Sequence, residues 1–196
     1  MMKKRNLLLF VCLILLLTGC ASKPQTAKDG QKWSDDWTTI GTSVGVEAPK
    51  KLTLLDTNEA LAADGMYYAT WTAGGSVPYE NSDGDTINLY DAQLYFLTNE
   101  AVSEKKAKSS CDTWLAAAKE NYEVHTENTV SFGGQSYTLI TYSCKNEDNP
   151  YDRGVSAFGV CGETAVCAEL ACLENYTEDL EALLAEFLNN CHFRAD

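Results

Sequence analysis

Short segments that alternate apolar with polar residues constrain the fold of this chain more than any other feature of its sequence. Residues 66–74 place Tyr67, Ala69 and Trp71 on one side of an extended chain, as a half-buried strand does. Further β-type runs are expected at residues 43–49, 51–55, 87–97, 123–132, 137–144, 154–161 and 165–173. The pair Gly133–Gly134 supplies the positive φ that a tight hairpin turn requires. Strands joined by such short turns must pair antiparallel.

Two segments change to the helical repeat. Residues 99–122 carry one apolar stripe, with Lys and Glu on the other side: Ala107, Cys111, Trp114, Leu115, Ala118 and Tyr122. A closing helix is expected after Asn175 or Thr177, either of which can cap its first turn. Its stripe is Leu180, Leu183, Leu184, Phe187, Leu188 and Cys191. Several strands, a helix, about four strands and a helix predict an α+β fold, a mainly antiparallel sheet flanked by two amphipathic helices in a layered sandwich.

The N-terminal residues have the pattern of an export signal. Lys3, Lys4 and Arg5 precede an apolar run over residues 7–17, which is shorter than the ~20 residues that a membrane-spanning helix needs. The run ends in the tetrapeptide Leu-Thr-Gly-Cys, which resembles the lipobox of bacterial lipoproteins. That resemblance implies cleavage just before Cys20 and a diacylglyceryl thioether with palmitate-type chains on its sulfur. An ordinary secretory signal cut elsewhere is the alternative.

These patterns divide the chain into three parts. Residues 1–19 are the expected lipoprotein signal peptide, and residues 20–36 are the lipidated cysteine and a polar tether without apolar periodicity. Residues 37–196 form the expected single globular α+β domain, whose length suffices for a sizeable core. The predicted location is the cell membrane, with the domain lipid-anchored on the extracytoplasmic side.

The charge balance excludes some partners. The formal net charge is −13, and cleavage of the signal removes three cationic residues, which lowers it to −16. Such a chain repels nucleic-acid phosphates and anionic lipid headgroups. No nucleic-acid partner is expected, and contact with the membrane is expected only through the lipid on Cys20.

Six cysteines remain once Cys12 in the signal and Cys20 are set aside: Cys111, Cys144, Cys161, Cys167, Cys172 and Cys191. An even number in an exported chain indicates up to three disulfides, while buried free thiols remain an alternative. Zinc is disfavoured, because the chain has no C-x-x-C pair. Hairpin geometry makes Cys161 and Cys167 candidate partners. Cys144 and Cys172 can bond only if their strands are adjacent, and Cys111 and Cys191 only if the two helices share a face of the sheet.

The order of elements resembles the PsbP-like fold, an antiparallel sheet flanked by helices. The resemblance is carried by VGVEAPKKLTLL, by the step from LYFLTNE to TWLAAAKENY, and by DLEALLAEFLNNCHF, and it covers residues 44–193. It implies an accessory or partner-binding protein without a shared set of catalytic residues, so it transfers no active site.

Motifs that suggest catalysis or metal binding occur in unfavourable contexts. Residues 41–45 match G-x-S-x-G, but no helical repeat follows, and residues 103–106 match S-x-x-K at a helix start. Asn81, Asp83 and Asp85 offer oxygen atoms, yet the spacing fails the EF-hand pattern. His125 and His192 have no cysteine, serine or carboxylate at a spacing that indicates a dyad. No cofactor, metal or catalytic residue is therefore predicted.

The function expected from the sequence is that of a non-enzymatic, membrane-anchored accessory or partner-binding lipoprotein. Its partner is expected to be an envelope protein or a glycan. A small-ligand or glycan-binding lipoprotein is the alternative, and it would use an exposed patch of aromatic residues. Candidates for that patch are Tyr67, Tyr68, Trp71, Tyr79, Tyr90 and Tyr95. A hydrolase whose site is assembled from distant residues is a third class.

Overall fold

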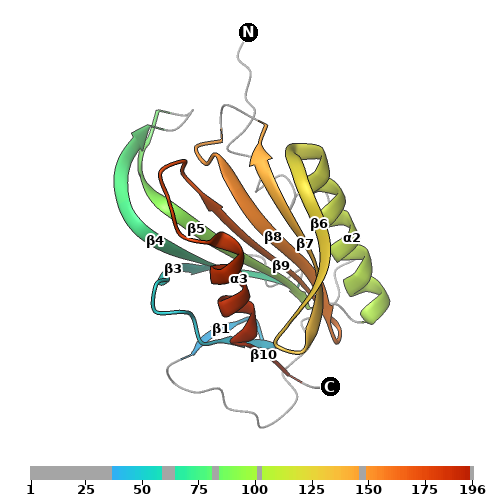
Figure 1. The fold of residues 1–196 in the computed structure, drawn as a ribbon. Helices are drawn as coiled ribbons and strands as arrows, with labels where there is room; N and C mark the ends of the chain where they lie inside the picture. The colour runs from blue at the N-terminus through green and yellow to red at the C-terminus, as the bar shows by residue number, and fades with distance from the viewer. Residues whose placement is uncertain (1–36, 59–64, 81–83, 101–102, 146–148, 195–196) are drawn as a thin grey trace.

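The structure, a computed structural model, describes residues 37–58, 65–80, 84–100, 103–145 and 149–194. Within these residues the main element is a seven-stranded sheet in the order β3-β4-β5-β9-β8-β7-β6 (Figure 1). Its strands are Thr53–Asn58 (β3), Met66–Glu80 (β4), Thr86–Glu100 (β5), Tyr122–Phe132 (β6), Gln135–Cys144 (β7), Arg153–Cys161 (β8) and Thr164–Cys172 (β9). Every neighbouring pair is antiparallel, which confirms the predicted sheet.

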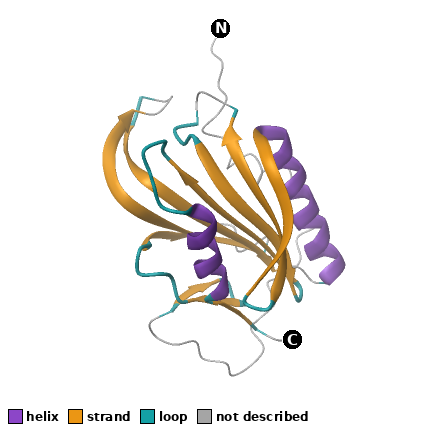
Figure 2. Ribbon diagram, in the orientation of Figure 1, coloured by secondary structure: helices purple, strands orange, loops and turns teal. Residues whose placement is uncertain are grey.

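Each face of the sheet has its own apolar core, because successive residues of a strand point to opposite sides. On β9, Val166 and Leu170 belong to the core beneath the closing helix, whereas Ala165 and Cys167 belong to the core beneath the first helix. The two helices of the described residues therefore cover opposite faces of the sheet (Figure 2). This is the layered α+β arrangement that the sequence predicts.

The first helix, α2, spans Glu104–Asn121. The Ser103 hydroxyl caps it by accepting a hydrogen bond from the Lys106 N–H (3.4 Å), so the S-x-x-K match is a helix start. Its buried residues are Ala107, Cys111, Trp114 and Ala118. The prediction placed both helix ends too far out, because residues 99–100 still belong to β5 and Tyr122 begins β6. Strand pairing extends over these residues and determines where the helix begins and ends.

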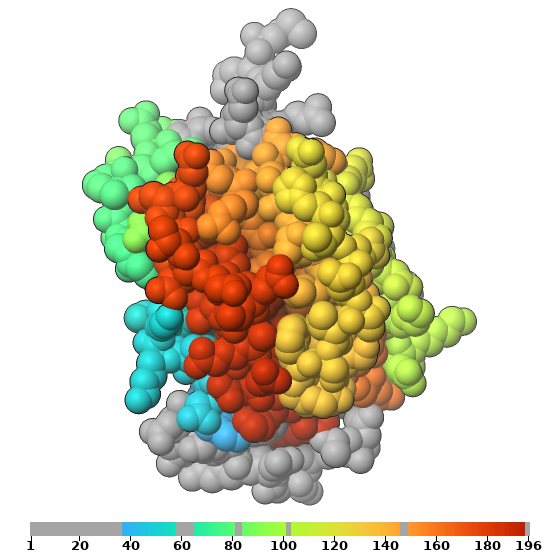
Figure 3. All heavy atoms as spheres, viewed as in Figure 1, coloured from blue at the N-terminus to red at the C-terminus, as the bar shows by residue number. Residues whose placement is uncertain are grey.

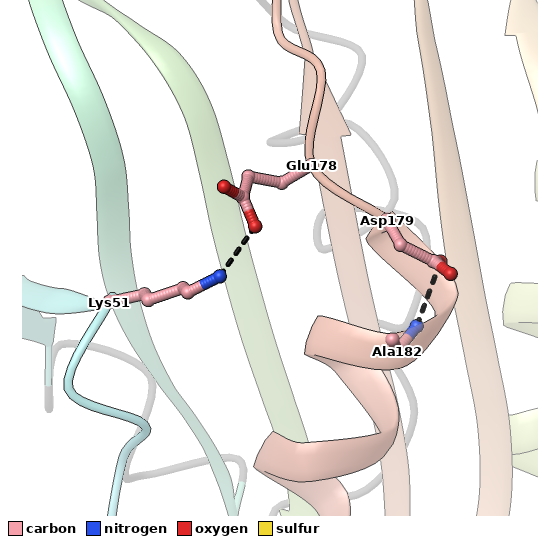
Figure 4. A network of polar contacts seen from close by, with 4 residues as sticks. All are labelled: Lys51, Glu178, Asp179 and Ala182. Carbon is pink, nitrogen blue, oxygen red and sulfur yellow. Dashed lines mark hydrogen bonds and ion pairs between the residues drawn. The ribbon is translucent and has the colours of Figure 1, made fainter.

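The closing helix, α3, spans Leu180–Asn189 and packs on the other face. Its cap is Asp179, whose carboxylate accepts a hydrogen bond from the Ala182 N–H (3.0 Å; Figure 4), so the caps predicted at Asn175 and Thr177 are wrong. Just before the cap, Glu178 pairs with Lys51 (2.5 Å), which lies next to β3. Both of these side chains are largely exposed, so the pair adds little to stability.

A second, three-stranded sheet joins the two ends of the described chain. It has the order β1-β2-β10, and its strands are Thr38–Ile40 (β1), Val44–Val46 (β2) and Cys191–Phe193 (β10). Cys191 was expected in the stripe of the closing helix, but it begins β10, where it is buried against the same core. Among the described helices, none has the length and apolarity that a membrane crossing requires.

Candidate functional site

A buried carboxyl group, Glu169 of β9, lies on the α2 face of the sheet. Tyr95 of β5 and Ser156 of β8 are its direct cross-strand neighbours. The Tyr122 hydroxyl, from the first residue of β6, donates a hydrogen bond to Oε1 (2.9 Å). The Ser156 hydroxyl donates to Oε2 (3.3 Å). Together with Tyr142 of β7, four strands thus place hydroxyl groups around one carboxyl group with an exposed fraction of 7%.

Burial raises the pKa of Glu169 to about 7, because the surrounding core disfavours the ionised form. The hydrogen bonds from Tyr122 and Ser156, and the nearby Tyr142 hydroxyl, act in the opposite direction. The pKa values of Tyr122 and Tyr142 are raised by burial first and by the Glu169 charge second. At neutral pH the phenols therefore stay protonated, while the carboxyl group is divided between its two forms.

Aromatic rings enclose this carboxyl group. Tyr122 stacks on Tyr142 with ring centroids 4.0 Å apart and nearly parallel planes. The Tyr142 hydroxyl and the Trp114 indole N–H, both buried in the core beneath α2, have no hydrogen-bond partner among the described residues. The group can hold a proton and accept hydrogen bonds, but its near-complete burial makes it a structural carboxyl group rather than an accessible catalytic one.

The sequence carried a signal for Glu169 that the prediction did not use. Residues 165–173, AVCAELACL, contain one acidic residue in an otherwise apolar strand, and every residue of β9 is buried. A carboxylate in such a strand needs donors or a proton. Its donors, Tyr122 and Ser156, come from other strands, so sequence spacing does not identify them.

The structure places His125 next to a serine, which the sequence spacing did not predict. Pairing of β6 with β7 brings His125 Nε2 within 2.7 Å of Ser143 Oγ. His125 is exposed on the edge strand, and no carboxylate of the described residues hydrogen-bonds to its ring. A triad needs such a third group to orient the base. His192 instead stacks on Trp37, with ring centroids 4.1 Å apart.

The G-x-S-x-G match forms the turn between β1 and β2. The Glu100 carboxylate accepts hydrogen bonds from the Thr42 N–H (2.6 Å), the Thr42 hydroxyl (2.6 Å) and the Ser43 N–H (2.8 Å). These bonds tie the turn to the end of β5. No helix follows the motif, so it is not a nucleophile elbow.

The six cysteines in the described residues are free thiols. Cys161 belongs to the core beneath α3 and Cys167 to the core beneath α2, so the sheet separates this predicted pair. The sheet separates Cys111 from Cys191 in the same way. Strand β8 lies between Cys144 and Cys172. The Cys144 N–H donates a hydrogen bond to the Asp152 carbonyl (2.9 Å), and the Asp152 N–H donates one to the Cys172 carbonyl (3.0 Å). The conditions for the Cys144–Cys172 and Cys111–Cys191 pairings are therefore not met, and Cys161 and Cys167 lie on opposite faces of the sheet.

Burial also keeps these thiols protonated at neutral pH. It raises the pKa of Cys111 and of Cys161 to about 11, and that of Cys144 to about 12. Within the described ranges, no three His, Cys, Asp or Glu side chains gather as metal ligands. Of the candidate calcium ligands, Asn81 and Asp83 lie outside the described residues, as does Cys20.

The aromatic residues predicted as a patch are dispersed. Tyr67 and Trp71 are buried in the core beneath α3. Tyr68 and Tyr95 are half-buried beside the core under α2, with ring centroids 5.1 Å apart. The other two, Tyr79 and Tyr90, lie near the outer end of the β4–β5 hairpin, where their cross-strand partners place them on opposite faces. No single exposed aromatic surface results.

That outer end of the hairpin projects beyond the rest of the sheet. Pairing of β3 with β4 ends at Thr72, and pairing of β9 with β5 ends at Ala92. Residues 74–80 and 86–91 therefore pair only with each other, and we call them the arm. In Figure 1 the two strands curve away past the ends of β3 and β9, and in Figure 3 the arm (green) lies at the margin of the molecule.

The base of the arm is a bend that specific residues hold in place. Gly74 has a φ of 80°, and a Cβ at this position would lie 2.4 Å from the Asp91 carboxylate, so only glycine fits. The same carboxylate accepts a hydrogen bond from the Gly75 N–H (2.6 Å). Register shifts between Ala73 and Ser76, which marks a β-bulge.

The arm has one apolar face. Val77 pairs with Leu89 and Tyr79 with Ile87, so all four side chains share a side. Val77 is 51% exposed and Ile87 41% exposed, whereas Leu89 between them is buried. The other large apolar side chains exposed in the described residues are Leu54 (45%) and Leu55 (49%) on the neighbouring edge strand β3. Exposed apolar surface thus gathers on the β3–β4–β5 side of the molecule.

This side of the molecule is also acidic. No lysine or arginine occurs between Lys51 and Lys105, a stretch that contains nine acidic residues. On the hairpin these include Glu80, Asp85 and Asp91. An apolar face with an acidic surround suits a partner that carries apolar and cationic groups together.

No protein-family model matches the chain, and no curated protein sequence is significantly similar to it. The solved structures to which the chain is similar include the following three. A Bacteroides thetaiotaomicron protein has a TM-score of 0.46 and 12% identity over 81% of this chain, which spans only 47% of that protein. Cyanobacterial PsbP (CyanoP) from Synechocystis sp. PCC 6803 has a TM-score of 0.39 and 13% identity, covering 78% of this chain and 93% of its own.

The third is LpqN of Mycobacterium tuberculosis, which is involved in cell envelope biogenesis. It has a TM-score of 0.42 and 11% identity, covering 78% of this chain and 83% of its own. Each of these TM-scores is below 0.5, so the likenesses carry no argument about what this chain binds or does.

Proposed function

We propose that this chain is a non-enzymatic lipoprotein, anchored to the extracytoplasmic side of a membrane through Cys20, that binds another envelope protein through the arm. The observation that carries the proposal is the apolar face of the arm, with Val77 and Ile87 about half exposed. A two-stranded hairpin without neighbouring strands is marginally stable in water. A partner that covers the apolar face would stabilise it.

Charge favours a protein over the membrane surface as the occupant. The hairpin carries acidic residues and no basic residue, so it is repelled by anionic headgroups. A protein surface that combines apolar side chains with Lys or Arg matches both properties of the arm. Anchoring through Cys20 holds the chain close to such partners without involving the arm itself.

Site-specific photocrosslinking in intact cells tests the arm. A photoreactive amino acid placed at Val77 or Ile87 is expected to give the same crosslinked protein, whereas the exposed position Thr129 on β6, at the opposite edge of the sheet, gives none. The double variant V77D/I87D with a crosslinker at Tyr79 should lose the product. The proposal would be refuted by crosslinks to lipid only or to a second copy only. Crosslinking from Thr129 as strong as that from Val77 and Ile87 would also refute it.

Anchoring is tested separately. With Cys20 replaced by Ser, the chain is expected to lose incorporation of labelled palmitate and to leave the detergent phase on phase partitioning. Unchanged labelling would refute lipidation at this residue. A rise in melting temperature of several degrees with soluble glycans, unaffected by V77D/I87D, would instead favour the glycan-binding alternative.

A further inference from the structure

Tyr122 connects the buried carboxyl group of Glu169 to the end of the first helix. It is the C-cap of α2, where its N–H donates a hydrogen bond to the Ala118 carbonyl, and it is also the first residue of β6. Its ring stacks on Tyr142, and its hydroxyl donates to Glu169 Oε1 (2.9 Å). The helix end and the edge strand, residues 118–124, are thus tied to the carboxyl group through one side chain (Figure 1), and we call these residues the junction.

Within the described residues, the groups that face Glu169 offer hydrogen bonds but no positive charge. They are Tyr95 of β5, Tyr122 of β6, Tyr142 and Cys144 of β7, Ser156 of β8, Cys167 of β9, and Cys111 and Trp114 of α2. Burial raises the pKa of each of these phenols and thiols, so they are neutral at neutral pH. Once ionised, the carboxylate is a buried charge without a cationic partner, which is costly.

The protonated carboxyl group fits these surroundings better. Its oxygen atoms accept hydrogen bonds from Tyr122 and Ser156 (2.9 and 3.3 Å). Its proton can be donated to the nearby Tyr142 hydroxyl, which has no hydrogen-bond partner among the described residues. Loss of the proton removes this donor and leaves a charge in the core.

Among the neighbours of Glu169, Tyr122 can move away with the least loss of structure. Trp114 and Tyr142 are almost completely buried. Tyr95 is half-buried, but it belongs to a strand that is paired on both sides. Tyr122 is half-buried and begins the edge strand, whose outer side pairs with no described strand. Displacement of Tyr122 is therefore the easiest way for water to reach the carboxyl group.

We propose that release of the proton from Glu169 opens the junction, so that the end of α2 and the first residues of β6 separate from the sheet as the pH rises through neutrality. This inference concerns the α2 face and is independent of the arm and its partner. The direction follows from the raised pKa of Glu169, because the closed form binds the proton more tightly than an open form in which water solvates the carboxylate.

Hydrogen exchange of the full chain in detergent, followed by mass spectrometry at pH 6 and pH 8.5, tests this device. Protection of residues 118–124, corrected for the intrinsic rate at each pH, should fall about tenfold, the ratio that pKa values of about 7 in the closed form and 4.5 in the open form give. Protection of residues 92–98 in β5 should stay unchanged. Glu169→Gln should give equal protection of the junction at both pH values. Glu120→Gln, an exposed position within the junction, should show the same fall as the unmodified chain.

Tyr122→Phe is a second variant that serves even if Glu169→Gln fails to fold. It keeps the ring that stacks on Tyr142 and removes the hydroxyl donor. Protection of the junction at pH 6 should fall about fivefold, as one lost hydrogen bond predicts. The further fall should move to higher pH, because the lost hydrogen bond is one that lowers the pKa of Glu169.

Three results would overturn the proposal. The first is protection of the junction that does not change with pH in the unmodified chain, and the second is a fall that persists in Glu169→Gln or stays at the same pH in Tyr122→Phe. The third is an equal fall in residues 92–98, which would mean that the whole sheet loosens rather than the junction.

Discussion

The β4–β5 hairpin has two halves that are both paired antiparallel strands but lie in different surroundings. In the inner half, Met66–Ala73 and Ala92–Glu100 lie between β3 and β9, and Trp71, Leu94 and Phe96 are almost completely buried. The outer half is the arm, in which Val77 and Ile87 are about half exposed. Both halves alternate apolar and polar residues along paired strands.

The difference is that neighbours cover the inner half, whereas in the arm Leu89 is buried and the other large apolar side chains, Val77 and Ile87, are exposed. Phe187 of α3 contacts both Trp71 and Phe96 edge to face, with ring centroids 4.9 and 5.4 Å apart. The arm has strand-forming residues, a bulge and a fixed bend, but none of the described helices covers it and none of the described strands pairs with it. Local sequence thus makes both halves strands, while the rest of the chain covers the inner half more fully than the arm. The exposed side chains of Val77 and Ile87 in the arm are the basis for assigning it a partner.

Matched truncations in the two halves have the largest expected effect. Leu94→Ala in the inner half should lower the free energy of unfolding by about 2–5 kcal/mol, because it removes a fully buried side chain. Ile87→Ala in the arm loses similar atoms at a half-exposed site and should cost less than about 1 kcal/mol. Urea unfolding of both variants measures the difference.

Equal losses in the two variants would break the comparison, because they would mean that the chain itself covers the arm. The unfolding slope with denaturant serves as the control, since an unchanged slope shows that both variants unfold from an equally compact state.

Replacement of the buried carboxyl group should give the next largest effect, and the effect should depend on pH. Glu169 has a pKa of about 7 in the folded chain and an ordinary value of 4.5. Its contribution to stability is complete below pH 4.5 and is lost as the pH rises through 7, because the folded chain binds the proton more tightly. Glu169→Gln should therefore stabilise the chain by on the order of 1–3 kcal/mol at pH 8 relative to pH 4.

Thermal or urea unfolding at several pH values measures this difference, with the exposed Glu120→Gln as the matched control. An effect of Glu169→Gln that is the same at pH 4 and pH 8 would show that the carboxyl group is not protonated by burial. It would also show that this face of the sheet is wetter than its burial indicates.

Much of the fold was predictable from the sequence, because alternation and helical repeat are local properties. The antiparallel strands, the buried residues Ala107, Trp114 and Leu184, and the hairpin turn at Gly133–Gly134 all follow from patterns within a few residues. The errors concern contacts between distant segments. Cys191 entered β10 because Val46 pairs with it, and residues 99–100 stayed in β5 because β9 pairs with them.

The candidate site was less predictable for the same reason. The residues around Glu169 come from four strands, and the His125–Ser143 contact arises from the pairing of β6 with β7. The exposure of the arm depends on where β3 and β9 stop pairing, which no pattern within residues 74–91 indicates. The condition for a Cys111–Cys191 bond is not met because the two helices cover opposite faces of the sheet, which the sequence does not indicate.

A smaller effect is expected at the bend where the two halves of the hairpin meet. Asp91→Ala removes the acceptor for the Gly75 N–H and should lower the free energy of unfolding by about 0.5–1 kcal/mol, as an exposed hydrogen bond does. Hydrogen exchange at residues 76–80 and 86–90 should accelerate, while exchange at Leu94 and Phe96 stays unchanged. Asn88→Ala, within the arm but away from the bend, is the control. Faster exchange in both halves would contradict a separate arm.

Replacement of an exposed valine should have the smallest effect on the free chain. Val77→Thr keeps the shape of the side chain and adds a hydroxyl group to a site that is 51% exposed, so the free energy of unfolding should change by less than about 0.5 kcal/mol. Val155→Thr, in the core beneath α3, is the matched control and should cost about 1–3 kcal/mol, since its hydroxyl group enters an apolar core. If Val77→Thr costs as much as the control, the apolar face of the arm is already covered within the chain, and the argument for a protein partner fails. If the cost is small while crosslinking from Ile87 is lost, the exposed valine serves binding rather than folding.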